Sequence, residues 1–211
     1  MSQNNAHLNE IWTKLEKAIV QMFELSFMTI KGYMDLYNAI GKYVASSEYN
    51  EMILKASPSE LQKKAEVAKN ENEVDDDDQI NTNHPSAQIY FKLKKTLKEN
   101  LDNIVKGGSH FTGEDFLRFY CKAWEIYQFT SRIVNSLLKF INDNWIRQQG
   151  EAGVKRVYNI YIMALKVWQD MFFKQANHSL TRTCLNLIKD ERDGKNINYS
   201  LIHEAIQSYG M

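Results

Sequence analysis

The stretch from Glu114 to Gln148 constrains what this chain can fold into more than any other part of it. Its apolar residues recur three and four positions apart, the spacing that places side chains on one face of an α-helix. Neither glycine nor proline interrupts the stretch, so it predicts one long helix, or two helices with a slight break near Thr130 and Ser131. At about 1.5 Å per residue, such an element would extend over roughly 50 Å and implies an elongated molecule. The apolar stripe consists of Phe116, Tyr120, Ala123, Trp124, Tyr127, Ile133, Val134, Leu137, Leu138, Ile141 and Trp145.

Helical spacing recurs through most of the remaining chain. Ser26 or Thr29 fits the cap of the second helix, Pro85 the start of the third, and Thr112 the cap of the long element. No stretch alternates polar and apolar residues over the length of a strand. The sequence therefore predicts an all-α fold of elongated, antiparallel helices. Besides the long element, helices are expected over residues 8–25, 33–44, 85–105, 154–173, 180–189 and 198–209, with a turn at 193–194.

Residues 46–85 differ in composition from the helical stretches. Serines, a Lys- and Glu-rich piece and four consecutive aspartates, Asp75 to Asp78, predict a flexible acidic insertion. Within it, Ser57 and Pro58 fit the start of a short helix. The aspartates do not form a calcium loop, because alternating ligands, a glycine turn and a distal glutamate are missing.

The overall charge does not favour a polyanionic partner. The chain has 26 basic and 26 acidic residues, so we expect neither a nucleic acid nor a membrane as its partner. The N-terminal residues do not have the pattern of a signal peptide, and no run of 18 apolar residues occurs. Cys121 and Cys184 lie in apolar helical runs and are expected to be buried free thiols in a reducing compartment. We therefore expect a cytoplasmic or nuclear protein.

The residue types of known catalytic and metal sites do not occur in the required patterns. The five histidines are scattered, and none is spaced from a cysteine or a second histidine as zinc ligands are. Glycine-rich phosphate loops and nucleophile motifs are absent from the sequence. Carboxylates such as Asp115 and Glu125 fit the solvated faces of amphipathic helices. We expect a non-catalytic protein with no metal site and no cofactor.

Several stretches resemble a known family. The long element, with its FLRFYxKAWEIYQFTSRIVNSLLKFINDNWIR wording, resembles the first repeat of a cullin. YMDLYNAIGKY at 33–43 is similar to the second cullin helix, which binds F-box adaptors, and residues 153–173 are similar to the helix that closes the repeat. Residues 187–209, with ERDGKNIN, resemble the opening of the second repeat. The resemblance implies a first cullin repeat at 1–175 and the start of a second at 176–211.

The resemblance also implies a function. Cullins are scaffolds of multisubunit ubiquitin ligases, whose N-terminal rod of helical repeats carries a BTB/POZ-fold F-box adaptor and, through it, F-box substrate receptors. A C-terminal domain recruits a RING subunit, which we expect as a partner only if such a domain exists beyond this chain. Because the sequence ends inside what resembles the second repeat, we expect either a fragment of a longer cullin or a short paralogue. An alternative function for a short paralogue is to sequester adaptors. A rival interpretation is a helical-repeat tethering protein outside the ubiquitin system.

The adaptor-binding residues follow from the resemblance, position by position. Leu36, Ile40 and one of the tyrosines fit a plain core role equally well, whereas Met34 lies off the apolar stripe and is expected to be exposed. The family commonly has tyrosine where Gly41 stands, asparagine at Lys42, cysteine at Val44, and a basic residue and histidine where Asp143 and Asn144 stand. These departures bear on which adaptor is bound. The resemblance nominates Tyr33, Met34, Leu36, Tyr37, Ile40 and, from a second patch, Trp145.

Overall fold

The computed structural model describes residues 2–24, 26, 28–55 and 84–210, and every regular element in these ranges is helical. This confirms the all-α prediction. None of the described helices is long and apolar enough to cross a membrane. The α-helices are α1 (Ser2–Phe23), α2 (Ile30–Lys55), α3 (Pro85–Gly108), α4 (Gly113–Leu137), α5 (Lys139–Ile141), α6 (Arg147–Glu151), α7 (Ile160–Trp168), α8 (Lys174–Arg192) and α9 (Tyr199–Gln207). Two π-helical turns, η2 (Asn142–Ile146) and η3 (Gln169–Phe173), and a 3₁₀ turn, η4 (Ser208–Gly210), complete the set.

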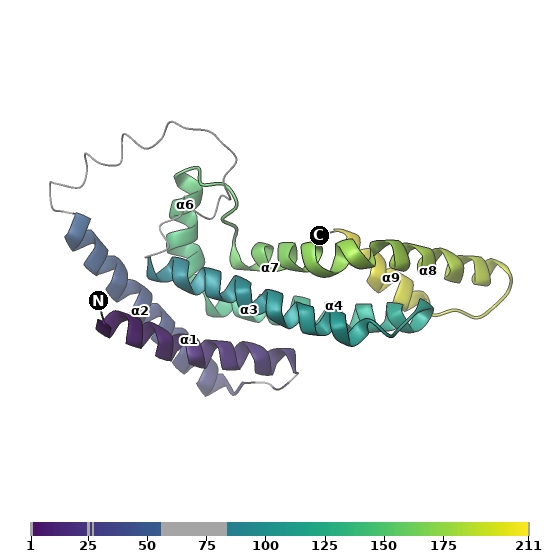
Figure 1. Cartoon of the computed structure of the whole chain (residues 1–211), viewed down its shortest axis with the longest axis horizontal. Coiled ribbons are helices and arrows are strands. Elements are labelled where there is room, and N and C mark those ends of the chain that lie inside the picture. The colour runs from purple at the N-terminus through teal and green to yellow at the C-terminus, as the bar shows by residue number, and fades with distance from the viewer. Residues whose placement is uncertain (1, 25, 27, 56–83, 211) are drawn as a thin grey trace.

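The helices form an elongated stack with α4 in its middle (Figure 1). Helix α4 packs against α1, α3, α7, α8 and α9, so it joins the two ends of the molecule. Helices α1 and α2 pack on each other at one end, and α8 and α9 lie at the other (Figure 1). The long stretch that the sequence singled out therefore supplies the central helix, as its apolar stripe predicts.

Trp168 lies at the centre of an aromatic core between α4 and α7. Its ring centroid lies 5.0–5.5 Å from those of Tyr120, Trp124 and Tyr127, and 4.9 Å from that of Phe172. The indole Nε1 donates a hydrogen bond to the Tyr120 hydroxyl at 3.2 Å. Large aromatic rings bury much apolar area per residue, and here their polar atoms are hydrogen-bonded. The aromatic residues of the chain therefore stabilise the contact between α4 and α7.

The helix ends agree with several of the predicted signals. The Thr29 hydroxyl accepts a hydrogen bond from the Gly32 N–H at 3.1 Å, so Thr29 caps α2. Helix α3 begins at Pro85, as its proline predicts, and ends at Gly108. The turn after α8 has Gly194 at φ +84°, a left-handed conformation that glycine adopts without steric cost.

Of the two alternatives for the long element, a break near Thr130 and Ser131 is wrong, because both residues are buried within α4. The Thr130 hydroxyl instead bonds the Met22 carbonyl of α1 at 3.5 Å. The chain leaves α-helical geometry at Leu138, with φ −99° and ψ 24°. After this residue the helical path bends, so that α6 is steeply inclined to α4 (Figure 1).

Three other boundaries differ from the sequence prediction. Helix α2 continues to Lys55, so the prediction of a flexible insertion that starts at residue 46 is wrong for residues 46–55. The remaining part, residues 56–83 with Ser57 and the four aspartates, lies outside the described residues. The helix expected from Val154 begins at Ile160, because Gly153 and Arg156 have φ values of +73° and +68°. The expected end near Phe173 does not occur, since α7, η3 and α8 form one continuous run. The division into repeats at residue 175 stays a prediction, and it falls inside that run.

Candidate functional site

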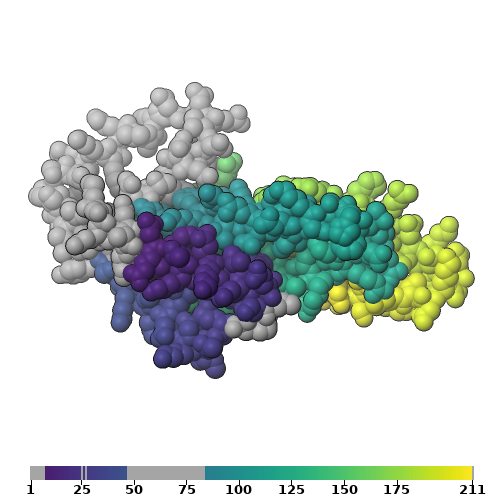
Figure 2. Space-filling view, turned by 60° about the horizontal axis from the view of Figure 1, so that its bottom comes forward, coloured from purple at the N-terminus to yellow at the C-terminus, as the bar shows by residue number. Residues whose placement is uncertain are grey.

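One side of α2 exposes apolar side chains near its N-terminus. Ile30, Tyr33, Met34 and Tyr37 are three or four positions apart and so share one side of the helix; we call them the α2 face. Ile30 is 86% exposed and Met34 is 45% exposed, while the two tyrosines are half-buried. The space-filling view shows blue α2 at the lower edge of the molecule (Figure 2). The predicted exposure of Met34 is confirmed.

A row of aromatic rings holds the α2 face against the corner after α4. The Tyr33 and Tyr37 rings stack with centroids 6.3 Å apart, and Tyr37 lies 4.9 Å from the ring of Phe140. A Cβ atom placed on Gly41 would lie only 2.5 Å from a Phe140 ring carbon, so glycine is what permits this close approach. Partial burial, and then the neighbouring Tyr37, raises the pKa of the Tyr33 phenol above its ordinary value.

Leu36 and Ile40 belong to the core of this structure. Their side chains are 7% and 0% exposed, so they present almost no surface to a partner. They lie on the side of α2 that packs against the rest of the bundle, which includes α1, α3 and α4. The core role that the sequence left open for Leu36 and Ile40 is therefore the one the structure shows.

Trp145, which the resemblance nominates from a second patch, presents almost no surface to a partner in this structure. Its side chain is 2% exposed and packs between Tyr90 and His84, at centroid distances of 5.5 and 6.2 Å. The residue lies in the π-turn η2. Its burial agrees with its place in the apolar stripe of the long element, which puts Trp145 on the buried side of the helical path.

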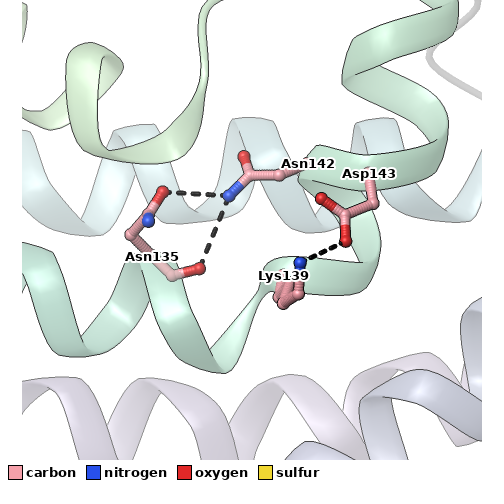
Figure 3. A network of polar contacts seen from close by, with 4 residues as sticks. All are labelled: Asn135, Lys139, Asn142 and Asp143. Carbon is pink, nitrogen blue, oxygen red and sulfur yellow. Dashed lines mark hydrogen bonds and ion pairs between the residues drawn. The ribbon is translucent and has the colours of Figure 1, made fainter.

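The surface near Trp145 is polar instead. At the exposed corner formed by α5 and η2, Lys139 Nζ lies 2.6 Å from Asp143 Oδ2 (Figure 3). This hydrogen bond, and then the charge of Asp143, raises the pKa of the Lys139 ammonium. An exposed ion pair of this kind contributes little stability, because water and salt screen the two charges. It does give the corner a defined charge pattern, where the sequence had suggested an aromatic anchor.

Two asparagines, Asn135 and Asn142, join this corner to the start of α7, and no pattern in the sequence signals them. Asn142 Nδ2 donates to Asn135 Oδ1 at 2.9 Å and to the Asn135 carbonyl at 3.4 Å (Figure 3). Asn142 Oδ1 accepts from the Ile160 N–H at 3.0 Å, and Asn135 Oδ1 accepts from the Tyr161 N–H at 3.2 Å. Both N–H groups belong to the first turn of α7 and have no partner within that helix. The pair therefore joins α4, η2 and α7 at one point.

Sequence reasoning also missed a groove between the start of α2 and α4. Phe129, which is 49% exposed, and Arg132 line it from the α4 side. Both lie off the apolar stripe of the long element, and Phe129 could have been recognised by the argument that singled out Met34. Among the described residues, no cluster of three or more histidine, cysteine or acidic side chains is arranged to hold a metal ion. Cys121 and Cys184 are buried free thiols, as predicted.

The stacked helices define the molecule as an α-solenoid. Residues 12–211 match the family model of the cullin alpha solenoid domain. The chain therefore belongs to the cullin family, as the resemblance of its motifs predicts.

Relatives within the family include Cullin-1 from several organisms. The chain is 25% identical to Cullin-1 of Dictyostelium discoideum over 99% of its own length, and 27% identical to Cullin-1 of Schizosaccharomyces pombe over 88%. It is also 27% identical to cell division control protein 53 of Saccharomyces cerevisiae over 58% of its length. These alignments cover 25%, 22% and 14% of the respective relatives, so the chain spans at most about a quarter of the proteins it matches.

Proposed function

We propose that this chain is the adaptor-binding part of a cullin scaffold. In this role it binds a BTB/POZ-fold F-box adaptor, so that substrates held by F-box receptors are positioned for ubiquitination, and it performs no chemistry itself. Membership of the cullin family and the similarity to Cullin-1 proteins support the proposal. A cytoplasmic or nuclear location is part of the same proposal.

The observation that carries the proposal is the α2 face. Soluble proteins seldom leave several large apolar side chains exposed together without a partner, and Ile30 and Met34 are exposed on adjacent turns of one helix. Half-buried Tyr33 and Tyr37 are stiffened by ring stacking, so little side-chain entropy is lost when a partner covers them. Aromatic and thioether side chains in such positions are typical interface anchors.

The nominated residues differ in how much surface they present to a partner. Met34, Tyr33 and Tyr37 have surface to offer, whereas Leu36, Ile40 and Trp145 act from the core. The departures from the usual family residues also gain a physical meaning. Gly41 admits the Phe140 ring beside Tyr37, and Asp143 is paired with Lys139. Both change the surface around the α2 face and so favour an adaptor complementary to this particular pattern.

The test is a binding titration of the purified chain against an F-box adaptor, with Met34→Asp as the main variant. A carboxylate covered by an apolar partner surface costs about 3 kcal/mol, which weakens binding about 150-fold. Leu185→Asp is the matched control, because Leu185 is also an exposed apolar residue but lies on α8 at the other end of the molecule. We expect its dissociation constant to stay within about threefold of wild type, and both variants to keep the wild-type helical circular dichroism.

Two results would contradict the proposal. If the folded wild-type chain does not bind the adaptor at micromolar concentrations, the adaptor role is wrong. If the chain binds but Met34→Asp and Leu185→Asp bind alike, the role stands and the α2 face is not the site. A Met34→Asp variant that loses its helicity would place Met34 in the core, contrary to its exposure.

A further inference from the structure

The groove beside the α2 face is predominantly apolar and large enough for side chains of a partner. It has a volume of about 540 Å³ and lies between the end of α1, the start of α2 and the second half of α4. Ile30 and Tyr33 belong both to its wall and to the α2 face, so the two surfaces are continuous. Its apolar wall is formed by Met22, Met28, Ile30, Tyr33, Phe129 and Ile133.

A single cation lies among these apolar side chains. Arg132 lines the groove with Ser136, and its guanidinium carbon lies 5.9 Å from the ring centroid of Tyr161. Within the described part of the chain, Arg132 forms no ion pair. Glu24 and Asp35, the carboxylates on the adjoining segments, are not among the residues that line the groove. An arginine held beside an aromatic ring at an apolar surface is well suited to pair with a carboxylate.

The start of α2 adds to the positive potential at this place. Its first turn contains no acidic residue, and the N-terminal end of a helix carries a partial positive charge. The groove therefore combines an apolar floor with a positive rim, which is complementary to an apolar side chain flanked by an acidic one.

We propose that this groove receives an amphipathic helix of the adaptor, with an apolar side chain between Ile30 and Phe129 and a carboxylate paired with Arg132. Grooves between two helices commonly bind the apolar face of a third helix, and the continuity with the α2 face allows one partner to cover both. The inference rests on the proposed function, because it extends the same interface beyond α2.

The charge pairing is tested in the same titration with three arginine variants. Arg132→Glu places a carboxylate opposite the partner's carboxylate, and we expect binding to weaken about 10-fold to 100-fold. Arg132→Lys keeps the charge and is expected to bind within about fivefold of wild type. Arg182→Glu, which makes the same change at an exposed position on α8, should leave the dissociation constant unchanged within about twofold.

The occupancy of the groove is tested with two variants of Ser136. Its hydroxyl donates a hydrogen bond to the Arg132 carbonyl of the same helix, at 3.1 Å, and the residue is exposed, so we expect both variants to keep the fold. Ser136→Tyr places a ring in the groove and is expected to weaken binding about tenfold or more by exclusion. Ser136→Ala leaves the groove open and is expected to bind as wild type does.

The possible outcomes separate the two proposals. Loss of binding in Met34→Asp together with unchanged binding in Arg132→Glu and Ser136→Tyr would overturn the groove inference and leave the adaptor role intact. Failure of the folded wild-type chain to bind the adaptor would overturn both. Sedimentation of the chain alone provides the last check, because a wild-type dimer that Ser136→Tyr dissociates would assign the groove to self-association and refute an adaptor helix as its occupant.

Discussion

Replacing Asn142 by alanine should destabilise the protein measurably, although its side chain is only partly buried. The variant removes the 2.9 Å bond from Asn142 Nδ2 to Asn135 Oδ1 and the 3.0 Å bond from the Ile160 N–H to Asn142 Oδ1. The contact with the Asn135 carbonyl is longer, at 3.4 Å, and adds little. At about 1 kcal/mol for each of the two shorter bonds, the expected loss is about 2 kcal/mol.

The two N–H groups in the first turn of α7 differ in their number of acceptors. The Tyr161 N–H has two acceptors, Asn159 Oδ1 at 2.9 Å and Asn135 Oδ1 at 3.2 Å. Asn159→Ala leaves one of them in place and should cost only about 0.5 kcal/mol, at the low end for a helix cap. In the described part of the structure, Asn142 Oδ1 is the acceptor for the Ile160 N–H, and no second acceptor can replace it. Asn142 should therefore matter more than Asn159, the residue that formally caps α7.

Urea unfolding followed by circular dichroism at 222 nm measures both changes. A loss of about 2 kcal/mol in a chain of this size also lowers the melting temperature by roughly 4–8 °C. Asn186→Ala, an exposed asparagine on α8, is the control and should change stability by less than about 0.5 kcal/mol. If Asn142→Ala were as stable as Asn186→Ala, the joint between α4, η2 and α7 would not depend on this side chain, and the reasoning would be refuted.

Two further predictions concern packing and pH. Gly41→Ala places a Cβ within 2.5 Å of the Phe140 ring, so the crowding cost of about 1–3 kcal/mol should outweigh the roughly 1 kcal/mol gained in helix propensity; a higher urea midpoint would show that the ring moves aside freely. Burial, and then Glu204, raises the pKa of the Cys121 thiol from 9.0 to about 12. Because the unfolded chain releases this proton at a lower pH than the folded chain, the free energy of unfolding should stay constant below pH 9 and fall between pH 9 and 12. The fall should be shallower in Cys121→Ala. If the free energy of unfolding fell equally steeply with pH in both proteins, the assignment to Cys121 would be contradicted.

The apolar pattern of the sequence was sufficient to predict most helices, because each must bury one face. The stripe in residues 114–148 predicts α4, the helix at the middle of the stack, and punctuating residues such as Pro85 and Gly108 locate the ends of α3. The same logic separated Met34 from the residues of the stripe on α2. A side chain off the stripe has no core to enter, so its exposure follows from spacing alone.

The pattern failed where the backbone departs from regular α-helix. The bend at Leu138 and the π-turn η2 lie inside the stretch that the apolar spacing predicts as regular helix, and no periodicity in the sequence signals either feature. Thr130 and Ser131 suggested a break because hydroxyl side chains compete for backbone hydrogen bonds. Here they are buried within α4, and the Thr130 hydroxyl bonds to α1, which is a tertiary contact.

The sequence by itself determined that this protein is helical, that α2 presents Met34 outward, and that its motifs are those of a cullin repeat. These properties depend on residue spacing within single helices and on local residue identity, which a linear chain displays directly. Only the tertiary structure decided that Leu36 and Ile40 belong to the core, that Gly41 admits Phe140, and that Arg132 lies in an apolar groove beside Tyr33. Such properties arise where residues far apart in the chain meet, and the distance and angle between two helices are set by the packing of all their side chains together.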